Sequence, residues 1–135
     1  MPRVHHLLGI LAAAAATACA GSPTDINTPN KRPANSISIV AGAETKGTSA
    51  FNPNPHEFSI RSPLSWFNDD EQPAGGQYGG SNGTIHNIAS DDGVSFVSGN
   101  IQPGGSFQHT FAAAGTYNYH CNIHPTMRGT LTVTP

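Results

Sequence analysis

Short runs in which apolar and polar residues alternate recur from residue 36 to the end of the chain. Alternation with a period of two places one face of a β-strand against a core. Turn-forming sequences such as DDG, QPGG and AAAG separate the runs. The runs predict strands at residues 36–41, 56–60, 64–68, 85–90, 94–99, 106–111, 115–121 and 129–135. Seven to eight short strands in about 100 residues indicate an all-β protein, an antiparallel β-sandwich.

Composition supports this fold class and narrows the range of functions. The chain has 135 residues, of which only 10% are charged, and it contains 15 glycines and 11 prolines. Abundant turn formers disfavour a helical bundle, and the length suits one domain with a tail. The formal net charge is −2. Nothing in the sequence is basic enough to indicate a nucleic-acid partner.

The N-terminus is typical of a targeting segment. An apolar run of twelve residues, LLGILAAAAATA, follows a start that carries one arginine. This run is too short to span a bilayer, so we interpret residues 1–18 as a signal peptide. Cys19 follows a small-x-small cleavage site, which resembles a bacterial lipoprotein signal with a lipidated cysteine; plain secretion is the alternative. We expect an exported protein of the periplasm or cell envelope, with membrane contact only through a lipid on Cys19.

The remainder divides into a tail and a folded part. Residues 19–36 are rich in proline, asparagine and threonine, without apolar periodicity, and are typical of a flexible linker. The folded domain is expected at residues 37–135. Within it, residues 71–84 form a glycine-rich loop, EQPAGGQYGGSNGT. We interpret this loop as solvated, with a role at a partner surface as the alternative.

Three soft ligand types lie within seven residues near the C-terminus: Cys121, His124 and Met127, in the segment YHCNIHPTM. Positions three apart lie on opposite faces of a strand and spread along the axis of a helix, so neither places three donors around one ion. A loop between the last two strands can do so, and Pro125 favours an extended backbone at His124. Thiolate, imidazole and thioether suit copper better than calcium or magnesium, and a thioether is a poor zinc ligand.

Such a site needs a second imidazole, for which four further histidines follow the signal peptide: His56, His86, His109 and His120. His120 precedes Cys121 on one strand and should point to the other face. His56 begins a strand and is expected at the surface. His109 alternates in phase with two phenylalanines, as a half-buried structural histidine would. His86 lies in the strand that follows the glycine-rich loop. The pattern favours His86 over His109 and leaves both open.

The segment AGTYNYHCNIHPTMRGTLTV resembles the C-terminal copper loop of the cupredoxins, above all the amicyanin-like branch; plastocyanins have a longer gap between the histidine and the methionine. WFND and IHNIAS are similar to the family's other ligand region, and the resemblance spans about residues 36–135. It implies a Greek-key sandwich and one type-1 copper ion. The implied ligands are His86, Cys121 and His124 in the plane and Met127 on the axis. Asn87 is implied to tie the two ligand segments together and to donate a backbone hydrogen bond to the cysteine sulfur.

The expected function is one-electron transfer, in which copper alternates between Cu(I) and Cu(II). We expect a monomer and a carrier, not an enzyme, that meets redox partner proteins near His124. A copper-binding or copper-delivery protein is the alternative. Delivery sites expose several labile ligands, whereas Met127 is the only methionine besides the initiator.

Overall fold

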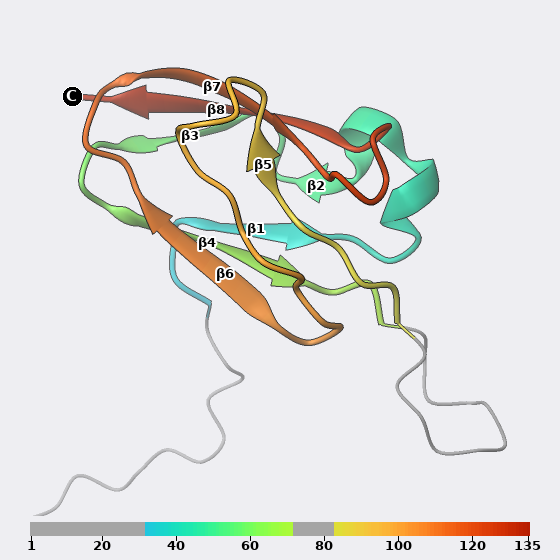
Figure 1. Ribbon diagram of the computed structural model, residues 1–135. Helices are drawn as coiled ribbons and strands as arrows, with labels where there is room; N and C mark the ends of the chain where they lie inside the picture. The colour runs from blue at the N-terminus through green and yellow to red at the C-terminus, as the bar shows by residue number, and fades with distance from the viewer. Residues whose placement is uncertain (1–31, 72–82) are drawn as a thin grey trace, which may run out of the picture. The chain divides into compact units, whose positions relative to one another are not determined.

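The computed structural model describes residues 32–71 and 83–135, whose strands form two four-stranded sheets (Figure 1). The first sheet has the order β2–β1–β4–β6 and contains β1 (Ser36–Ile39), β2 (Phe51–Asn52), β4 (Pro63–Asn68) and β6 (Ser106–Thr110). The second has the order β3–β8–β7–β5 and contains β3 (His56–Ser59), β5 (Ala89–Ser90), β7 (Gly115–His120) and β8 (Arg128–Thr134). Two short 3-10 helices, η1 (Ala43–Thr45) and η2 (Gly47–Ser49), lie between β1 and β2. In this part of the chain, no helix has the length and apolar character needed to span a membrane.

The β-sandwich predicted from the sequence is confirmed, but its strands are not all antiparallel. β1 pairs in parallel with β4, and β3 pairs in parallel with β8. Parallel neighbours require a connection that leaves the pair and returns. Here β2 and β3 intervene between β1 and β4, so the chain visits the second sheet before it returns to the first. Alternation along a strand reports which face is buried and carries no information on the direction of its neighbour.

The core lies between the two sheets and follows the period-two pattern. β1 buries Ile37 and Ile39, and β8 buries Leu131 and Val133, while the residues between them are partly exposed. Trp66 is fully buried at the centre, with its ring centroid 5.6 Å from that of Phe96. Removing such a side chain costs about 3–5 kcal/mol in comparable cores. The two sheets are therefore held as a rigid support for the loops at their ends.

Two of the predicted strands are much shorter than the sequence indicated. In residues 85–90 only Ala89 and Ser90 form a strand, and His86 makes an isolated bridge with Ile101. Residues 94–99 contribute only a bridge between Val97 and Ala89. The turn between them is closed by the carboxylate of Asp92, which accepts hydrogen bonds from the backbone of residues 94 and 95. The Ser98 hydroxyl accepts a hydrogen bond from the Ile88 backbone at 2.8 Å, and the Ser90 hydroxyl accepts one from the Phe96 backbone at 3.2 Å. These side-chain oxygens take the place of part of the strand ladder.

The described residues begin at Arg32, and the end of the segment predicted to be a linker contacts the sandwich. The Arg32 guanidinium forms an ion pair with Asp69 and lies 4.5 Å from the centre of the Phe67 ring. The carbonyl of Asn35 accepts a hydrogen bond from the Ser65 backbone at 3.1 Å. The predicted signal peptide, Cys19 and most of the glycine-rich loop lie outside the described residues.

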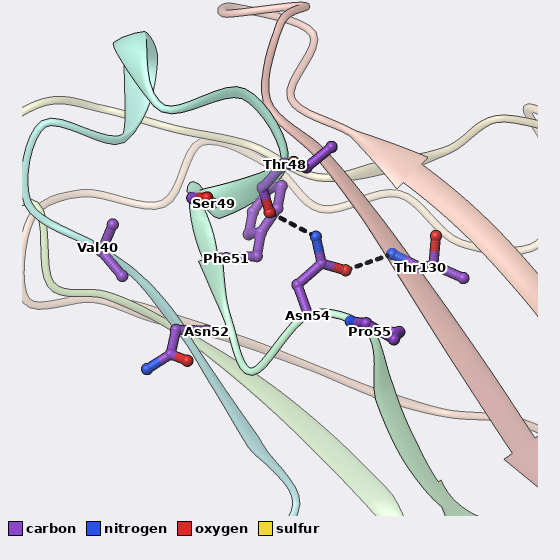
Figure 2. Close-up of a pocket in the computed structure, with 8 residues that line it drawn as sticks. All are labelled: Val40, Thr48, Ser49, Phe51, Asn52, Asn54, Pro55 and Thr130. Carbon is purple, nitrogen blue, oxygen red and sulfur yellow. Dashed lines mark hydrogen bonds between the residues drawn. The ribbon is translucent and has the colours of Figure 1, made fainter.

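A pocket of about 650 Å³ lies beside β2 and the start of β3 (Figure 2). Asn54 crosses it: its amide nitrogen donates to the Thr48 carbonyl at 2.7 Å, and its oxygen accepts from the Thr130 backbone at 2.9 Å. None of its lining residues is a candidate metal ligand; these are Val40, Thr48, Ser49, Phe51, Asn52, Asn54, Pro55 and Thr130. We interpret the Asn54 contacts as a structural link between η2 and β8.

Candidate metal centre

The loop between β7 and β8 carries three of the four candidate ligands, at one end of the sandwich (Figure 1). Its base is closed by a hydrogen bond from the Cys121 backbone to the Met127 carbonyl at 3.3 Å. The Met127 backbone in turn donates to the His124 carbonyl at 3.0 Å. The predicted position of this loop between two strands is therefore confirmed. Cys121 and Met127 are fully buried, and His124 is half-buried.

His86 reaches the same place from a different segment. It is fully buried, and its backbone exchanges two hydrogen bonds with Ile101, at 3.2 and 2.7 Å. This bridge fixes the backbone of His86 although no longer strand forms there. Of the histidines left open by the sequence pattern, His86 is the one that the fold brings to the ligand loop.

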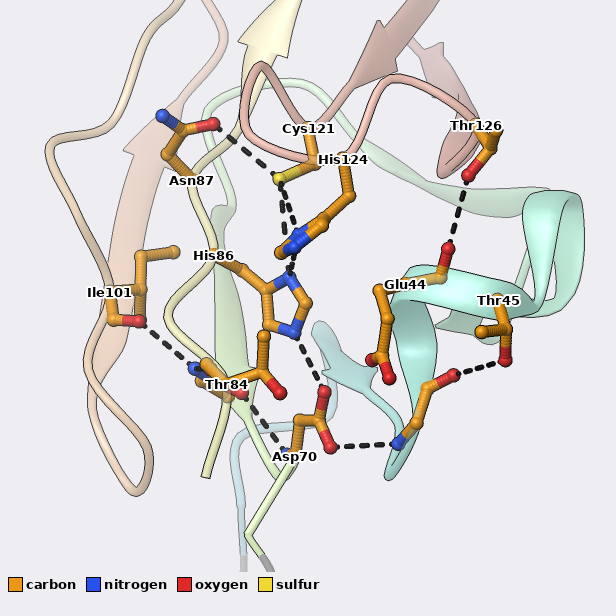
Figure 3. Close-up of polar contacts among 12 residues, drawn as sticks. Glu44, Thr45, Asp70, Thr84, His86, Asn87, Ile101, Cys121, His124 and Thr126 are labelled. Carbon is orange, nitrogen blue, oxygen red and sulfur yellow. Dashed lines mark hydrogen bonds and ion pairs between the residues drawn. The ribbon is translucent and has the colours of Figure 1, made fainter. Parts of the chain in front are cut away.

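Three donor atoms form a compact triangle, which Figure 3 shows from the side. The Cys121 sulfur lies 3.9 Å from Nδ1 of His86 and 3.9 Å from Nδ1 of His124, and the two nitrogens lie 3.3 Å apart. A triangle with these sides has a point about 2.2 Å from all three atoms. Zinc is a first-row metal similar in size to copper, and its bonds to nitrogen and thiolate sulfur are roughly 2.0–2.3 Å long. The spacing of the donors therefore fits one metal ion.

The surroundings favour the thiolate form of Cys121, which is the form that binds metals. Burial alone would raise its pKa. Hydrogen bonds from His86 and from the backbone amides of Asn87, His124 and Ile123 outweigh burial and lower the pKa of Cys121 to about 6. The lowered pKa favours the anionic form of the Cys121 sulfur in the metal-free chain.

Met127 completes the donor set by chemistry and burial. Its side chain belongs to the same buried cluster as that of Cys121. A thioether together with a thiolate and two imidazoles is the combination found at blue-copper sites, where the methionine is a weak ligand. Zinc would be expected to take a fourth strong ligand, so the donor chemistry fits copper better.

Asn87 makes the contact that the resemblance implied. Its side-chain oxygen accepts a hydrogen bond from the Asn122 backbone at 2.8 Å (Figure 3 shows the side chain). The backbone amide of Asn87 is also one of the donors that lower the pKa of Cys121. Asn87 therefore joins the segment of His86 to the segment of Cys121.

Asp70 holds the far side of His86, and nothing in the sequence pointed to it. Nε2 of His86 lies 2.9 Å from the Asp70 carboxylate, which is almost completely buried (Figure 3). The other carboxylate oxygen accepts a hydrogen bond from the Gly42 backbone at 2.7 Å. Burial would raise the pKa of Asp70, but the hydrogen bonds from His86 and Gly42 outweigh it and lower that pKa. Two adjacent aspartates after a strand are typical of an ordinary turn. Only the tertiary structure shows the contact between Asp70 and His86.

The other histidines lie elsewhere. His120 points to the opposite face and contacts Asp91 and Asn122, as expected. His109 packs at the edge of the core, 4.7 Å from the Phe111 ring, which agrees with its interpretation as structural. His56 begins β3 as predicted, but it is half-buried, and its Nε2 is enclosed without a hydrogen-bond partner among the described residues. The Phe58 ring stacks on the His56 ring, with their centroids 5.6 Å apart.

Comparison with known proteins agrees with the chemistry of the donor set. Residues 33–134 match the model of a family described as copper binding proteins, plastocyanin/azurin family. Among solved structures, a purple cupredoxin from Nitrosopumilus maritimus is 28% identical, with a TM-score of 0.59. That match covers 73% of this chain and 98% of the other. No curated protein sequence matched the chain.

More distant structures share the fold. A copper-containing nitrite reductase from Thermus scotoductus SA-01 is 22% identical with a TM-score of 0.57, over 78% of this chain but 23% of the reductase chain. A Cu(I) form of an amicyanin variant is 22% identical with a TM-score of 0.55, over 77% of this chain and 85% of the other. At these identities the likeness concerns the fold alone. The family match spans three quarters of the sequence and includes all four candidate ligands. The chain therefore belongs to the plastocyanin/azurin family of copper-binding proteins: it is a cupredoxin, and its cofactor is copper.

Proposed function

We propose that the protein is a one-electron carrier with a single type-1 copper site. His86, Cys121, His124 and Met127 would hold the copper ion. The triangle of donor atoms, with sides of 3.9, 3.9 and 3.3 Å, is the observation that carries this proposal. When bound, copper supplies a one-electron couple between Cu(I) and Cu(II). The remaining features of electron transfer come from the chain itself.

The chain holds its donors in a nearly fixed arrangement. Three of the four candidate ligands are fully buried, and their segments are tied by the Asn87 contact and by the closed base of the loop. A rigid site changes little in geometry when its charge changes, which lowers the reorganisation required for electron transfer. Burial of the thiolate also keeps water away from it. A site with buried and fixed donors should release its metal slowly. This argues against a delivery protein, which must release its metal readily.

His124 would provide the route for electrons. It is the one candidate ligand that is partly exposed, and it is followed by the exposed Pro125. The apolar side chains of Ile123 and Ile85 are 44% and 37% exposed in the same two ligand segments. We therefore propose that redox partner proteins dock around His124. As in the interpretation of the sequence, a monomer is expected.

A carrier is favoured over an enzyme by the metal-binding groups of the described residues. Among residues 32–71 and 83–135, each cluster of side chains able to hold a metal includes His86. One redox centre built around His86 suits a protein that passes on a single electron.

The carrier function is tested by electrochemistry of the copper-loaded chain. We expect one reversible one-electron wave, fast exchange with a small redox protein, and loss of both in Cys121→Ser. A copper site that is reduced but not reoxidised, or one that exchanges copper with a chelator within seconds, would favour the delivery alternative.

We also propose that the protein is exported and acts in the periplasm or cell envelope. Support comes from the signal-like residues 1–18 and from Cys19 directly after the cleavage site. If Cys19 is lipidated, the protein should partition with membranes, and Cys19→Ala should release it. Mass spectrometry that shows an unmodified Cys19 at the mature N-terminus would exclude the lipid anchor.

A further inference from the structure

We propose that Asp70 is a positioning residue that orients His86 as a copper ligand and, through its negative charge, keeps the reduction potential of the site low. This inference rests on the proposed function, because it takes His86 as a ligand.

The two nitrogens of the His86 ring have separate tasks. Nδ1 is one corner of the donor triangle, 3.9 Å from the Cys121 sulfur, and Nε2 faces Asp70 at 2.9 Å. An imidazole that donates its Nε2 proton to a carboxylate has its lone pair on Nδ1. The contact thus selects the tautomer that binds a metal and sets the plane of the ring. Both side chains are at most 2% exposed, so water does not compete for this hydrogen bond.

Asp70 is itself held in place by Asn68, which also contacts the backbone near His86. Its backbone donates to the side-chain oxygen of Asn68 at 3.0 Å. The Asn68 amide donates to the carbonyls of Thr84 and Ile101, at 2.8 and 2.9 Å. Ile101 is the residue whose backbone bridges His86. The backbone and the ring of His86 are therefore fixed by one connected network, in which Asp70 is the member that hydrogen-bonds to the ring.

The charge of Asp70 gives it an effect beyond orientation. A carboxylate that accepts the Nε2 proton increases the electron density on Nδ1, which makes the nitrogen a stronger donor. A buried negative charge also stabilises Cu(II) more than Cu(I), since the interaction is only weakly screened. Both effects favour the oxidised form. A neutral asparagine at this position would keep an acceptor oxygen but lose the charge, so Asp70→Asn separates the two roles.

One other group faces Asp70 and must be considered. The carboxylate of Glu44 points toward the same space (Figure 3), and ligand atoms of Glu44, Asp70 and His86 lie within 4.8 Å of one another. A cation held by these three side chains would replace the Nε2 proton of His86. The presence of that proton therefore distinguishes a hydrogen bond from a second metal site.

The first test locates the proton in the wild-type chain. The Cu(I)-loaded protein is diamagnetic, and its histidine ring protons can be followed by proton–nitrogen magnetic resonance, with His86 assigned by comparison with His86→Gln. We expect an Nε2 proton that exchanges slowly with water and resonates far downfield. A rapidly exchanging or missing Nε2 proton would overturn the proposal. This measurement requires no variant at position 70 and stands if such a variant fails to fold.

The second test compares reduction potentials of the wild type, Asp70→Asn and Asp69→Asn. Asp69→Asn is a matched control: it removes the same charge one residue away, from a carboxylate that contacts Arg32 and Ser38 and not His86. We expect Asp70→Asn to weaken Cu(II) binding about tenfold more than Cu(I) binding, within the range for residues that support metal ligands. This ratio corresponds to a rise of about 59 mV for a one-electron couple. Asp69→Asn should keep the wild-type potential.

The outcomes separate this inference from the proposed function. An equal rise in both variants, or an unchanged potential in Asp70→Asn with an intact site, would overturn the effect of the Asp70 charge on the potential while leaving the carrier function in place. The orienting role of Asp70 stands or falls with the Nε2 proton of the first test. A wild-type protein without a thiolate-to-copper absorption band would refute the proposed function, and the inference with it.

Discussion

Asn87→Ala should weaken copper binding more than it weakens the fold. The side chain of Asn87 connects the segment of His86 to the segment of Cys121 by accepting the Asn122 backbone hydrogen bond at 2.8 Å. Alanine removes the acceptor and changes no charge. The two ligand segments then lose the side-chain contact that sets their spacing at the metal site.

The magnitude follows from the exposure of the contact. The Asn122 amide lies at the surface, so it can bond to water once Asn87 is truncated, and the cost should be about 1 kcal/mol. For a domain of about 100 residues, this lowers the melting temperature by about 4–8 °C. Loss of residues that support ligands usually costs about 10–100-fold in metal affinity. We expect about tenfold for Asn87→Ala, because the backbone amide of Asn87 still donates to the Cys121 sulfur.

The assay is a competitive copper titration combined with thermal unfolding of the metal-free chain. Asn118→Ala is the matched control, since its side-chain oxygen accepts a hydrogen bond from the Thr130 hydroxyl at 2.9 Å on the exposed face of β7. The two variants should lose similar stability, but only Asn87→Ala should lose copper affinity. Equal copper affinity in both variants would refute the idea that Asn87 aligns the ligand segments.

Three further predictions concern the packing and the histidines. Gly129→Ala should destabilise the protein by about 1–3 kcal/mol, because an added methyl group would collide with the Tyr119 ring. Gly99→Ala, where nothing lies within 4 Å, should be nearly neutral, and similar melting temperatures for the two would contradict the packing argument. Burial lowers the pKa of His109, so the unfolded state takes up a proton below about pH 6.5 more readily than the folded state does. Wild-type stability should therefore fall from pH 8 to pH 5 more steeply than that of His109→Phe; parallel denaturant-unfolding curves would disagree. In copper-loaded protein, His86→Ala should abolish the thiolate-to-copper absorption band, whereas His109→Phe should retain it; the reverse result would exchange the ligand assignment.

Much of the fold could be predicted because its strands bury one face. The alternation at β1 and β8 is regular, since each strand sets Ile37 and Ile39, or Leu131 and Val133, into the core. The alternation of apolar and polar residues predicted strands that are too long where two segments pair over only a few residues. Residues 85–90 carry an apolar rhythm, yet His86 forms only a bridge. Further along, the hydroxyls of Ser98 and Ser90 accept backbone hydrogen bonds that a regular ladder would use. The parallel pairings were also beyond reach, because they depend on where distant strands meet.

The candidate site divides in the same way. Cys121, His124 and Met127 lie close together in the sequence, so their chemistry was visible as a motif. His86 could be favoured but not separated from His109 by pattern alone, since both sit in short alternating runs. Asp70 was invisible, because an aspartate after a strand has many uses and its contact with His86 depends on how distant segments pack.

The most direct test of the copper assignment is the absorption and electron paramagnetic resonance of the chain loaded with one Cu(II). A site made of His86, Cys121, His124 and Met127 should give an intense visible band from charge transfer between thiolate and copper, together with a narrow copper hyperfine splitting. The band should be absent in Cys121→Ser. A pale protein with a tetragonal copper spectrum typical of nitrogen and oxygen ligands would contradict the assignment.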